Sequence, residues 1–457
     1  MKKHLFPLLL LAACLTTGLQ AQTNKFRVDT LISNGPANKL IDLVFLAEGY
    51  TESELPKFLD DAKVSMEGFF RQEPFTRYRE YFNVIAISSI SNETGAGRTP
   101  DEPIDNIFGT CFGTNGSDRL LWPTKSDVVA AVLSANYPAY DVAALIVNSS
   151  TYGGAGGNIL TFSTHFESCE LFYHEFGHTF ASLADEYWPG SGSEKANMTA
   201  ESDPDKVKWK NWVGTDGVGV YPYEGGPEAA KWYRPHQGCR MRVLGVDYCD
   251  VCRETIVERI HSKVNCIFDF TPARNKTLNF NDEPMDFSIE LLNPEPNTLK
   301  IEWLLDGEVY DKDKTTCQLD AATLASLDDK QHTFVASVED TTAFVRVDDH
   351  AARHARTIKW NIKRDPKSGI EVRASEASYT LSSTFFTTNL TVTSREAQRE
   401  GMSVQLVDLS GRPVLTQAWG NAPQCLLQTS GLPAAAYVLR VVTPQGATAY
   451  ATKVVKR

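Results

Sequence analysis

The stretch His174-Glu175-Phe176-Gly177-His178 carries the strongest chemical signal in the chain. On a helix its two histidines lie one turn apart on one face, so both imidazoles can bind the same ion. Zinc accepts neutral imidazole nitrogen, and a carboxylate at Glu175 can take a proton from a zinc-activated water. The spacing predicts His174 and His178 as zinc ligands and Glu175 as the general base. The pattern His-Glu-x-x-His also occurs by chance in unrelated helices.

A catalytic zinc needs a third protein ligand and one open position. The pair Asp185-Glu186 follows the motif closely enough to supply it. A straight helix would carry Asp185 about 10.5 Å along its axis from His178, so the helix must end or bend within 181–184. We favour Asp185 as the ligand and Glu186 as a supporting or packing salt bridge, and the reverse order stays open.

Two residues further along could complete such a centre. Met241 is either core filler or, in a turn after the zinc helix, the apolar floor beneath the metal. Tyr233 could donate a hydrogen bond to a developing oxyanion, and ordinary packing is an equal alternative.

The residues around the motif alternate between strand and helix patterns. Apolar runs predict strands at 41–46, 81–90 and 143–148, and an edge strand at 158–163. Apolar residues at helical spacing predict helices at 54–70, 126–133 and 167–183. Such alternation is typical of an α/β domain with a mostly parallel sheet. The glycines at 153–157 lack the ending of a phosphate loop and indicate a flexible turn.

After Cys266 the pattern changes to short strands separated by turns. It predicts two antiparallel β-sandwich modules of the immunoglobulin-like kind. The expected organisation is multidomain: a signal peptide at 1–21, an α/β catalytic domain at 22–268, one sandwich at 269–366 and a second at 367–457.

Composition limits the function classes. The chain has 457 residues and a formal charge of −12, without the basic footprint of a nucleic-acid binder. After the N-terminus no apolar stretch reaches the roughly 18 residues of a membrane span.

The N-terminus has the pattern of an export signal, with a basic start, a short apolar stretch and a cleavage site after Ala21. Lipidation at Cys14 is the alternative. Export to an oxidising compartment predicts disulfides among the remaining cysteines, with unknown connectivity. The Cys249-x-x-Cys252 pair, with Cys239 and Cys266 nearby, is a weaker zinc-site alternative.

Separated stretches within about 27–266 together resemble one family. They are LVFLAEGYT at 43–51, PFTRYREYFNV at 74–84, YGGAGG at 152–157, HEFGHTFASLADEY at 174–187, VKWKNWVG at 207–214, YRPHQGCRMR at 233–242 and YCDVC at 248–252. This region is similar to the immunoglobulin-A peptidase family of zinc metallopeptidases. The resemblance implies a metzincin-like fold and hydrolysis of protein or glycoprotein substrates. It implies His174, His178 and Asp185 as zinc ligands, Glu175 as the base and Met241 as the Met-turn. The family name assigns no substrate here.

The C-terminal stretches VDLSGRPV at 407–414, GLPAAAYVLRVV at 431–442 and KVVKR at 453–457 resemble the sorting domain of type IX secretion cargo. The resemblance implies recognition by secretion machinery and a secreted or cell-surface protein exported through the periplasm. An ordinary β-sandwich binding module is the alternative.

These observations predict an exported zinc endopeptidase. The alternatives are a surface adhesin or glycan-binding protein with a non-catalytic metal site, and a zinc hydrolase of non-peptide amides. An intact Glu175 favours an enzyme, because a purely structural site needs no base.

Overall fold

The computed structural model describes residues 25–274, 276–281, 283–365, 379–395 and 401–457. Its contacts divide the chain into one unit up to Lys363 and a second unit, Arg364–Arg457. The expected leader with Cys14 and Ala21 lies outside the described residues, as does the expected boundary at residue 367. Among the described residues, no helix has the length and apolar character needed to cross a membrane.

A six-stranded sheet in the order β1-β3-β2-β6-β8-β7 forms the centre of the N-terminal part. The four inner strands run parallel, and the two edge strands pair antiparallel with their neighbours. The strands are β1 (Arg27–Ile32), β2 (Ile41–Glu48), β3 (Phe82–Ser88), β6 (Val142–Val147), β7 (Gly154–Ala155) and β8 (Leu160–Ser163). The predicted strands at 41–46, 81–90 and 143–148 are confirmed as inner strands.

The predicted edge position of residues 158–163 is wrong. This segment forms β8, which pairs with β6 on one side and with β7 on the other. The glycine-rich residues before it supply the edge strand, because Gly154 and Ala155 pair with Phe162 and Thr161.

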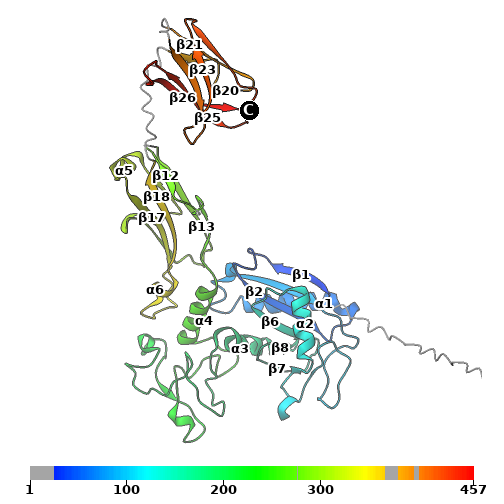
Figure 1. Cartoon of the computed structure of the whole chain (residues 1–457). Coiled ribbons are helices and arrows are strands. Elements are labelled where there is room, and N and C mark those ends of the chain that lie inside the picture. Colours follow the sequence, from blue (N-terminus) through cyan, green and yellow to red (C-terminus); the bar gives the residue numbers. More distant parts are fainter. Residues whose placement is uncertain (1–24, 275, 282, 366–378, 396–400) are drawn as a thin grey trace, which may run out of the picture. The chain divides into compact units, whose positions relative to one another are not determined.

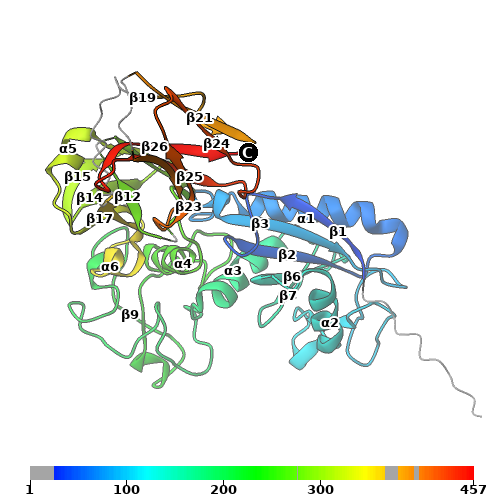
Figure 2. The same cartoon turned by 45° about the horizontal axis from the view of Figure 1, so that its top comes forward.

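Helices cover both faces of this sheet (Figure 2). They are α1 (Leu55–Phe69) and α3 (Ser168–Ala181) on one face and α2 (Ser126–Asn136) on the other. A further helix, α4 (Asp250–Lys263), packs against α3. Side chains alternate along β2, so Leu43 and Phe45 join the core that contains α1 and α3, whereas Val44 and Leu46 join the core that contains α2. A strand buried on both faces reads as a continuous apolar run.

Most of the segment 182–249, between α3 and α4, is irregular (Figure 1). It contains a short pair of strands, β9 (Tyr221–Pro222) and β10 (Tyr233–Arg234). Another short pair, β4 (Thr110–Cys111) and β5 (Trp122–Pro123), lies in the loop before α2.

Two packed sheets follow α4, around the buried aromatic residues Trp303, Phe334 and Trp360. One sheet contains β11 (Ile267–Thr271), β13 (Met285–Leu291) and β16 (Thr316–Leu319). The other contains β12 (Leu278–Phe280), β18 (Arg356–Arg364), β17 (Gln331–Asp340), β14 (Leu299–Leu305) and β15 (Glu308–Lys312). Two short helices, α5 (Ala321–Ser326) and α6 (His350–His354), complete this module.

A buried carboxylate joins this module to the N-terminal part. Asp340, at the end of β17, accepts a hydrogen bond from the Tyr78 hydroxyl at 2.8 Å, and His261 Nε2 on α4 lies 3.0 Å from the same oxygen. Removing the Asp340 carboxylate would deprive two buried polar groups, the Tyr78 hydroxyl and His261 Nε2, of this partner. Such contacts explain why residues up to Lys363 form one compact unit although a boundary was expected at 268.

The second unit by itself is also a pair of sheets around one apolar core. One sheet contains β19 (Tyr379–Leu381), β21 (Asn389–Ser394) and β24 (Gln424–Gln428). The other contains β20 (Phe385–Phe386), β26 (Thr448–Lys456), β25 (Ala436–Val442), β22 (Met402–Val407) and β23 (Pro413–Trp419). The chain is therefore rich in β-structure, arranged in several sheets.

The prediction of disulfides is wrong for the described cysteines. None of the eight, from Cys111 to Cys425, forms a disulfide in the structure. Cys111 lies on β4, Cys317 on β16 and Cys425 on β24, on elements that do not pair with one another. Cys266 and His261 line the same small pocket. Cys266 does not belong to the cluster of possible metal ligands that contains Cys249 and Cys252.

Candidate active site

The helix α3 carries the His-Glu-x-x-His motif. Its residues Phe172, Phe176 and Phe180 recur at helical spacing and are buried, and the ring of Phe176 lies 4.7 Å from that of Phe69 on α1. This apolar face fixes the rotation of α3 about its axis. His174 and His178 consequently project from another side of the helix, one turn apart.

The chain reverses directly after α3. The helix ends at Ala181, and Ser182 adopts a left-handed conformation with φ 55°. The N–H of Leu183 then donates to the carbonyl of Gly177 at 3.2 Å, which closes the turn. The helix thus ends within 181–184, as a shared metal site for His178 and Asp185 requires. The chain beyond it returns toward the histidines.

This reversal brings Asp185 to both histidines. Its Oδ1 lies 3.1 Å from Nε2 of His174 and 3.1 Å from Nε2 of His178, and the two Nε2 atoms are themselves 3.1 Å apart. Ligand atoms bound tetrahedrally to zinc at 2.0–2.1 Å would be separated by about 3.3 Å. The equal spacing of these three atoms therefore fits a small tetrahedral cation.

The Nδ1 atoms of the two imidazoles contact backbone carbonyls. Nδ1 of His174 lies 3.0 Å from the oxygen of Arg240, and Nδ1 of His178 lies 2.7 Å from the oxygen of Leu183. A carbonyl can only accept, so each Nδ1 carries a proton, and loss of the Nε2 proton would leave a lone pair on that side of the ring for a cation.

The two carboxylates of the site differ in their electrostatics. Burial raises the pKa of Glu175 above its ordinary value, with the charges of the histidines opposing the rise. Burial would also raise the pKa of Asp185, but hydrogen bonds from His174 and His178 hold it well below the ordinary value. Asp185 is thus anionic at neutral pH, whereas Glu175 is more readily protonated, as suits a group that exchanges protons.

Glu186 points away from the histidines. It is fully buried, and its Oε1 lies 3.2 Å from Sγ of Cys252 and accepts a hydrogen bond from Nδ2 of Asn197. No salt bridge involving Glu186 occurs among the described ion pairs, so the expected supporting salt bridge is wrong. Of the two adjacent carboxylates, Asp185 is the one that the fold brings to the motif.

Met241 lies under the motif helix. It is fully buried, and a Cβ atom at Gly177 would meet its sulfur at 2.9 Å, so the two residues are in close contact. Its carbonyl accepts a hydrogen bond from the N–H of Glu186 at 2.7 Å. Met241 therefore contacts both the helix between the histidines and the chain that carries Asp185.

A cavity of about 260 Å³ opens beside His174 and Glu175. Its lining residues are Arg119, Tyr152, Leu171, His174, Glu175, Tyr187, Arg240, Arg242 and Leu244. Tyr233 is not among them: it lies on β10, where its backbone pairs with Thr199.

Tyr187 is the tyrosine that the fold brings to this cavity. Its ring stacks over that of His174 with centroids 6.5 Å apart. Burial and then the neighbouring Asp185 carboxylate raise its pKa, so the phenol stays protonated and can donate a hydrogen bond. Its position two residues after Asp185 was a usable sequence signal. Arg119 had none, because the long loop before α2 places it.

The glycine run lies against the side chain of Glu175. A Cβ atom at Gly156 would lie 1.9 Å from Oε2 of Glu175 and 3.1 Å from the Cβ of Glu175. The carbonyl of Gly157 accepts a hydrogen bond from the Thr179 hydroxyl at 3.0 Å. The run is thus a close packing contact with α3 as well as a turn.

With Glu175 as the expected general base, replacing Gly156 with Ala should lower hydrolysis without lowering metal content. The added methyl group must displace the Glu175 side chain, and a displacement near 1 Å can cost up to about 100-fold in rate. We expect a loss of roughly ten-fold or more, measured as the initial rate of peptide cleavage. Gly420→Ala is the control, since a Cβ atom there meets nothing within 4 Å. Equal rates for Gly156→Ala and the unaltered protein would contradict this account.

Comparison with known proteins adds three findings. The family described as IgA Peptidase M64 matches residues 30–225. No curated protein matches the chain. Among solved structures, the chain is similar to the fibronectin(III)-like modules of Clostridium thermocellum CbhA, with 15% identity over 21% of this chain and 94% of that chain and a TM-score of 0.15. It is also similar to SGBP-B of the Bacteroides ovatus mixed-linkage glucan utilization locus, with 10% identity, 41% of this chain, 47% of that chain and a TM-score of 0.15.

TM-scores this low support no conclusion about fold or function. The family match is informative, because the matched residues include the whole of α3 and Asp185. Residues 30–225 of this chain thus match the IgA peptidase M64 family, and this match supports a peptidase.

Proposed function

We propose that the chain is an exported zinc endopeptidase that cleaves peptide bonds of extracellular proteins. The observation that carries the proposal is the triangle of Nε2, Nε2 and Oδ1 atoms from His174, His178 and Asp185, each pair 3.1 Å apart. Two neutral imidazoles and one carboxylate are a ligand set typical of catalytic zinc, which keeps one position open. The donor set therefore fits the ion.

Zinc in such a site lowers the pKa of a bound water and polarises the scissile carbonyl. In our proposal Glu175 accepts the proton of the attacking water and returns it to the leaving amine. The raised pKa of Glu175 supports both transfers. Tyr187, which stays protonated beside the cavity, donates a hydrogen bond to the substrate oxygen as negative charge develops there. We assign this role to Tyr187 in preference to Tyr233.

We further propose that the N-terminal part has a metzincin-like architecture. Three observations support it: the motif lies on one helix, the chain reverses directly after that helix to deliver the third ligand, and Met241 packs beneath the ligands.

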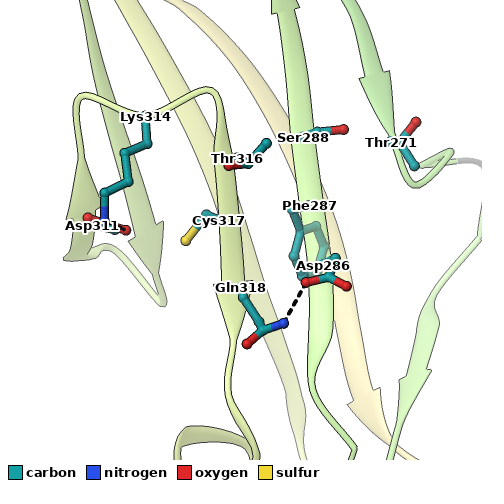
Figure 3. A pocket seen from close by; sticks show the side chains of 9 residues that line it. All are labelled: Thr271, Asp286, Phe287, Ser288, Asp311, Lys314, Thr316, Cys317 and Gln318. Carbon is teal, nitrogen blue, oxygen red and sulfur yellow. Dashed lines mark hydrogen bonds and ion pairs between the residues drawn. The ribbon is translucent and has the colours of Figure 1, made fainter.

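A glycan-binding function would need a ligand site outside this centre. A pocket of about 520 Å³ lies on the first β-sandwich (Figure 3). Its charged and amide side chains form two pairs: Gln318 donates to Asp286 at 2.7 Å, and Lys314 pairs with Asp311 at 3.0 Å. The observations therefore favour the peptidase.

Metal removal tests the proposed function. The full chain should cleave peptides within a mixture of unlabelled proteins, lose this activity on treatment with a chelator and regain it when zinc is added back. New peptide ends identified by mass spectrometry are the readout. Cleavage that survives complete zinc removal, or release of sugar or cell-wall fragments in place of peptides, would reject the proposal.

The C-terminal unit has a separate proposed role in export. The type IX-like stretches lie between residues 407 and 457, and the contacts separate this unit from the remainder of the chain at Arg364. A chain that ends at Arg364 should retain peptidase activity in vitro. In its host it should accumulate in the periplasm and fail to reach the cell surface. Fractionation of cells and medium measures this, and normal surface delivery of the shortened chain would contradict it.

A further inference from the structure

A second group of ligand-type side chains lies behind the active site. It consists of Cys239, Cys249, Cys252 and Glu186, and is called the thiol group below. One ligand atom from each residue lies within 4.8 Å of all the others. Sγ of Cys239 lies 3.7 Å from Sγ of Cys252, and Oε1 of Glu186 lies 3.2 and 3.9 Å from the sulfurs of Cys252 and Cys249.

These separations fit one tetrahedral ion. With Zn–S bonds of about 2.3 Å and a Zn–O bond of about 2.1 Å, sulfur atoms lie about 3.8 Å apart, and sulfur and oxygen about 3.6 Å apart. Thiolates favour soft ions such as zinc over magnesium or calcium.

The burial of the thiol group points to a missing positive charge. Cys239, Cys252 and Glu186 are each fully buried, and Cys249 is 7% exposed. Oε2 of Glu186 is a buried oxygen without a hydrogen-bond partner among the described residues. An unpartnered carboxylate oxygen next to three buried sulfurs is costly unless a cation compensates it.

The start of α4 favours negative charge on its two cysteines. Cys249 is the N-cap residue of α4 and Cys252 lies in its first turn, where the helix dipole stabilises negative charge. The backbone N–H of Cys249 donates to Sγ of Cys239 at 3.3 Å. Asn197 binds Oε1 of Glu186 and also the carbonyl of Ala184, which orients the carboxylate toward the sulfurs.

The position of the thiol group in the chain suggests a structural role. Glu186 lies just after α3, Cys239 near the end of the irregular segment 182–249, and the other two cysteines at the start of α4. Within this segment the separate apolar cluster is small: Ala184, Met198, Tyr223 and Ala229. Other residues of the segment, among them Trp209 and Trp212, pack into the main core. A metal cross-link between its two ends would add to the stability of this largely irregular segment.

We propose that Cys239, Cys249, Cys252 and Glu186 bind a structural zinc ion, distinct from the catalytic one. All four positions are filled by protein ligands, so no position remains for water or substrate. Glu186 directly follows Asp185, and its N–H binds the carbonyl of Met241. The structural ion thereby anchors the chain that presents Asp185. The proposal stands whether or not the active site hydrolyses peptides.

Oxidation offers the competing explanation. Two of the three thiols could form a disulfide, which would leave the third thiol and the buried carboxylate without a cation. The two explanations differ in metal content, in mass and in the spectrum of a cobalt-substituted protein.

The test uses the full chain. We expect two equivalents of zinc per chain by elemental analysis and, after replacement of zinc by Co²⁺, an intense thiolate-to-cobalt charge-transfer absorption. The active-site residues described above include no sulfur ligand, so the absorption reports the thiol group alone. Cys252→Ser should bind one equivalent and lose most of the absorption. Cys317→Ser, a buried thiol elsewhere, should keep both.

Glu186→Gln separates the carboxylate from the sulfurs. This variant should retain the absorption but bind Co²⁺ at the thiol group at least about ten-fold more weakly. If Cys252→Ser does not fold, the unaltered protein still decides the question through its metal content and spectrum. A single equivalent of zinc, no charge-transfer absorption and a mass lower by two hydrogens would overturn the proposal in favour of a disulfide.

Discussion

Replacing Glu175 with Gln is expected to lower peptide hydrolysis by at least about two orders of magnitude, the scale of general acid–base catalysis. The amide keeps the size of the carboxylate but cannot accept a proton from water. Zinc should remain bound, because the atoms that form the equal triangle belong to His174, His178 and Asp185. The rate of peptide cleavage and the zinc content should be measured on the same purified sample.

The control is Glu228→Gln, which changes an exposed carboxylate paired with Lys231. It should leave both the rate and the zinc content unchanged. Substantial residual hydrolysis in zinc-loaded Glu175→Gln would exclude Glu175 as the base and would favour the binding-protein alternative.

Asp185→Ala is expected to remove the catalytic zinc and to abolish hydrolysis. Asp185 supplies the single anionic oxygen of the triangle, and removing it leaves two neutral imidazoles to hold a divalent ion. We expect zinc affinity at this site to fall by more than about 100-fold, beyond the loss seen when an outer hydrogen-bond partner of a ligand is removed. Titration with zinc in a competing chelator measures the affinity.

Glu186→Gln is the matched comparison at the adjacent carboxylate. It should keep the zinc that activity requires, whereas Asp185→Ala should keep the cobalt–thiolate absorption and lose activity. The opposite ranking, with activity more sensitive to Glu186 than to Asp185, would show that the third-ligand assignment is wrong.

Elements with strong periodic patterns could be predicted closely. The run at 41–46 became β2, the residues 54–70 became α1, and the motif helix at 167–183 became α3. Prediction was weaker for a strand's position in the sheet, because that position depends on which other strands pair with it. Residues 158–163 form an inner strand because Gly154 and Ala155, which lack a strand pattern, pair outside them.

The cysteines illustrate the same limit. Composition and the leader indicated disulfides, yet the described cysteines form none in the structure. The weaker zinc-site alternative included Cys239, Cys249 and Cys252 but named Cys266 as the fourth residue. Glu186 takes that place in the fold. No spacing rule links a carboxylate after α3 to thiols at the start of α4, because the intervening chain is long and irregular.

The sequence by itself determined which ligand-type and acid–base side chains lie together on one helix. Four-residue spacing places His174 and His178 one turn apart wherever the helix lies, and Glu175 must then lie beside them. Only the tertiary structure shows that Asp185, and not Glu186, lies beside the two histidines. The left-handed turn at Ser182 sends Asp185 back to the histidines, and successive side chains diverge, so Glu186 enters the thiol group. Tyr187, Arg119 and Gly156 likewise reach the site through the chain path. Helix periodicity fixes positions over one or two turns, whereas contacts between distant segments depend on how the whole core packs.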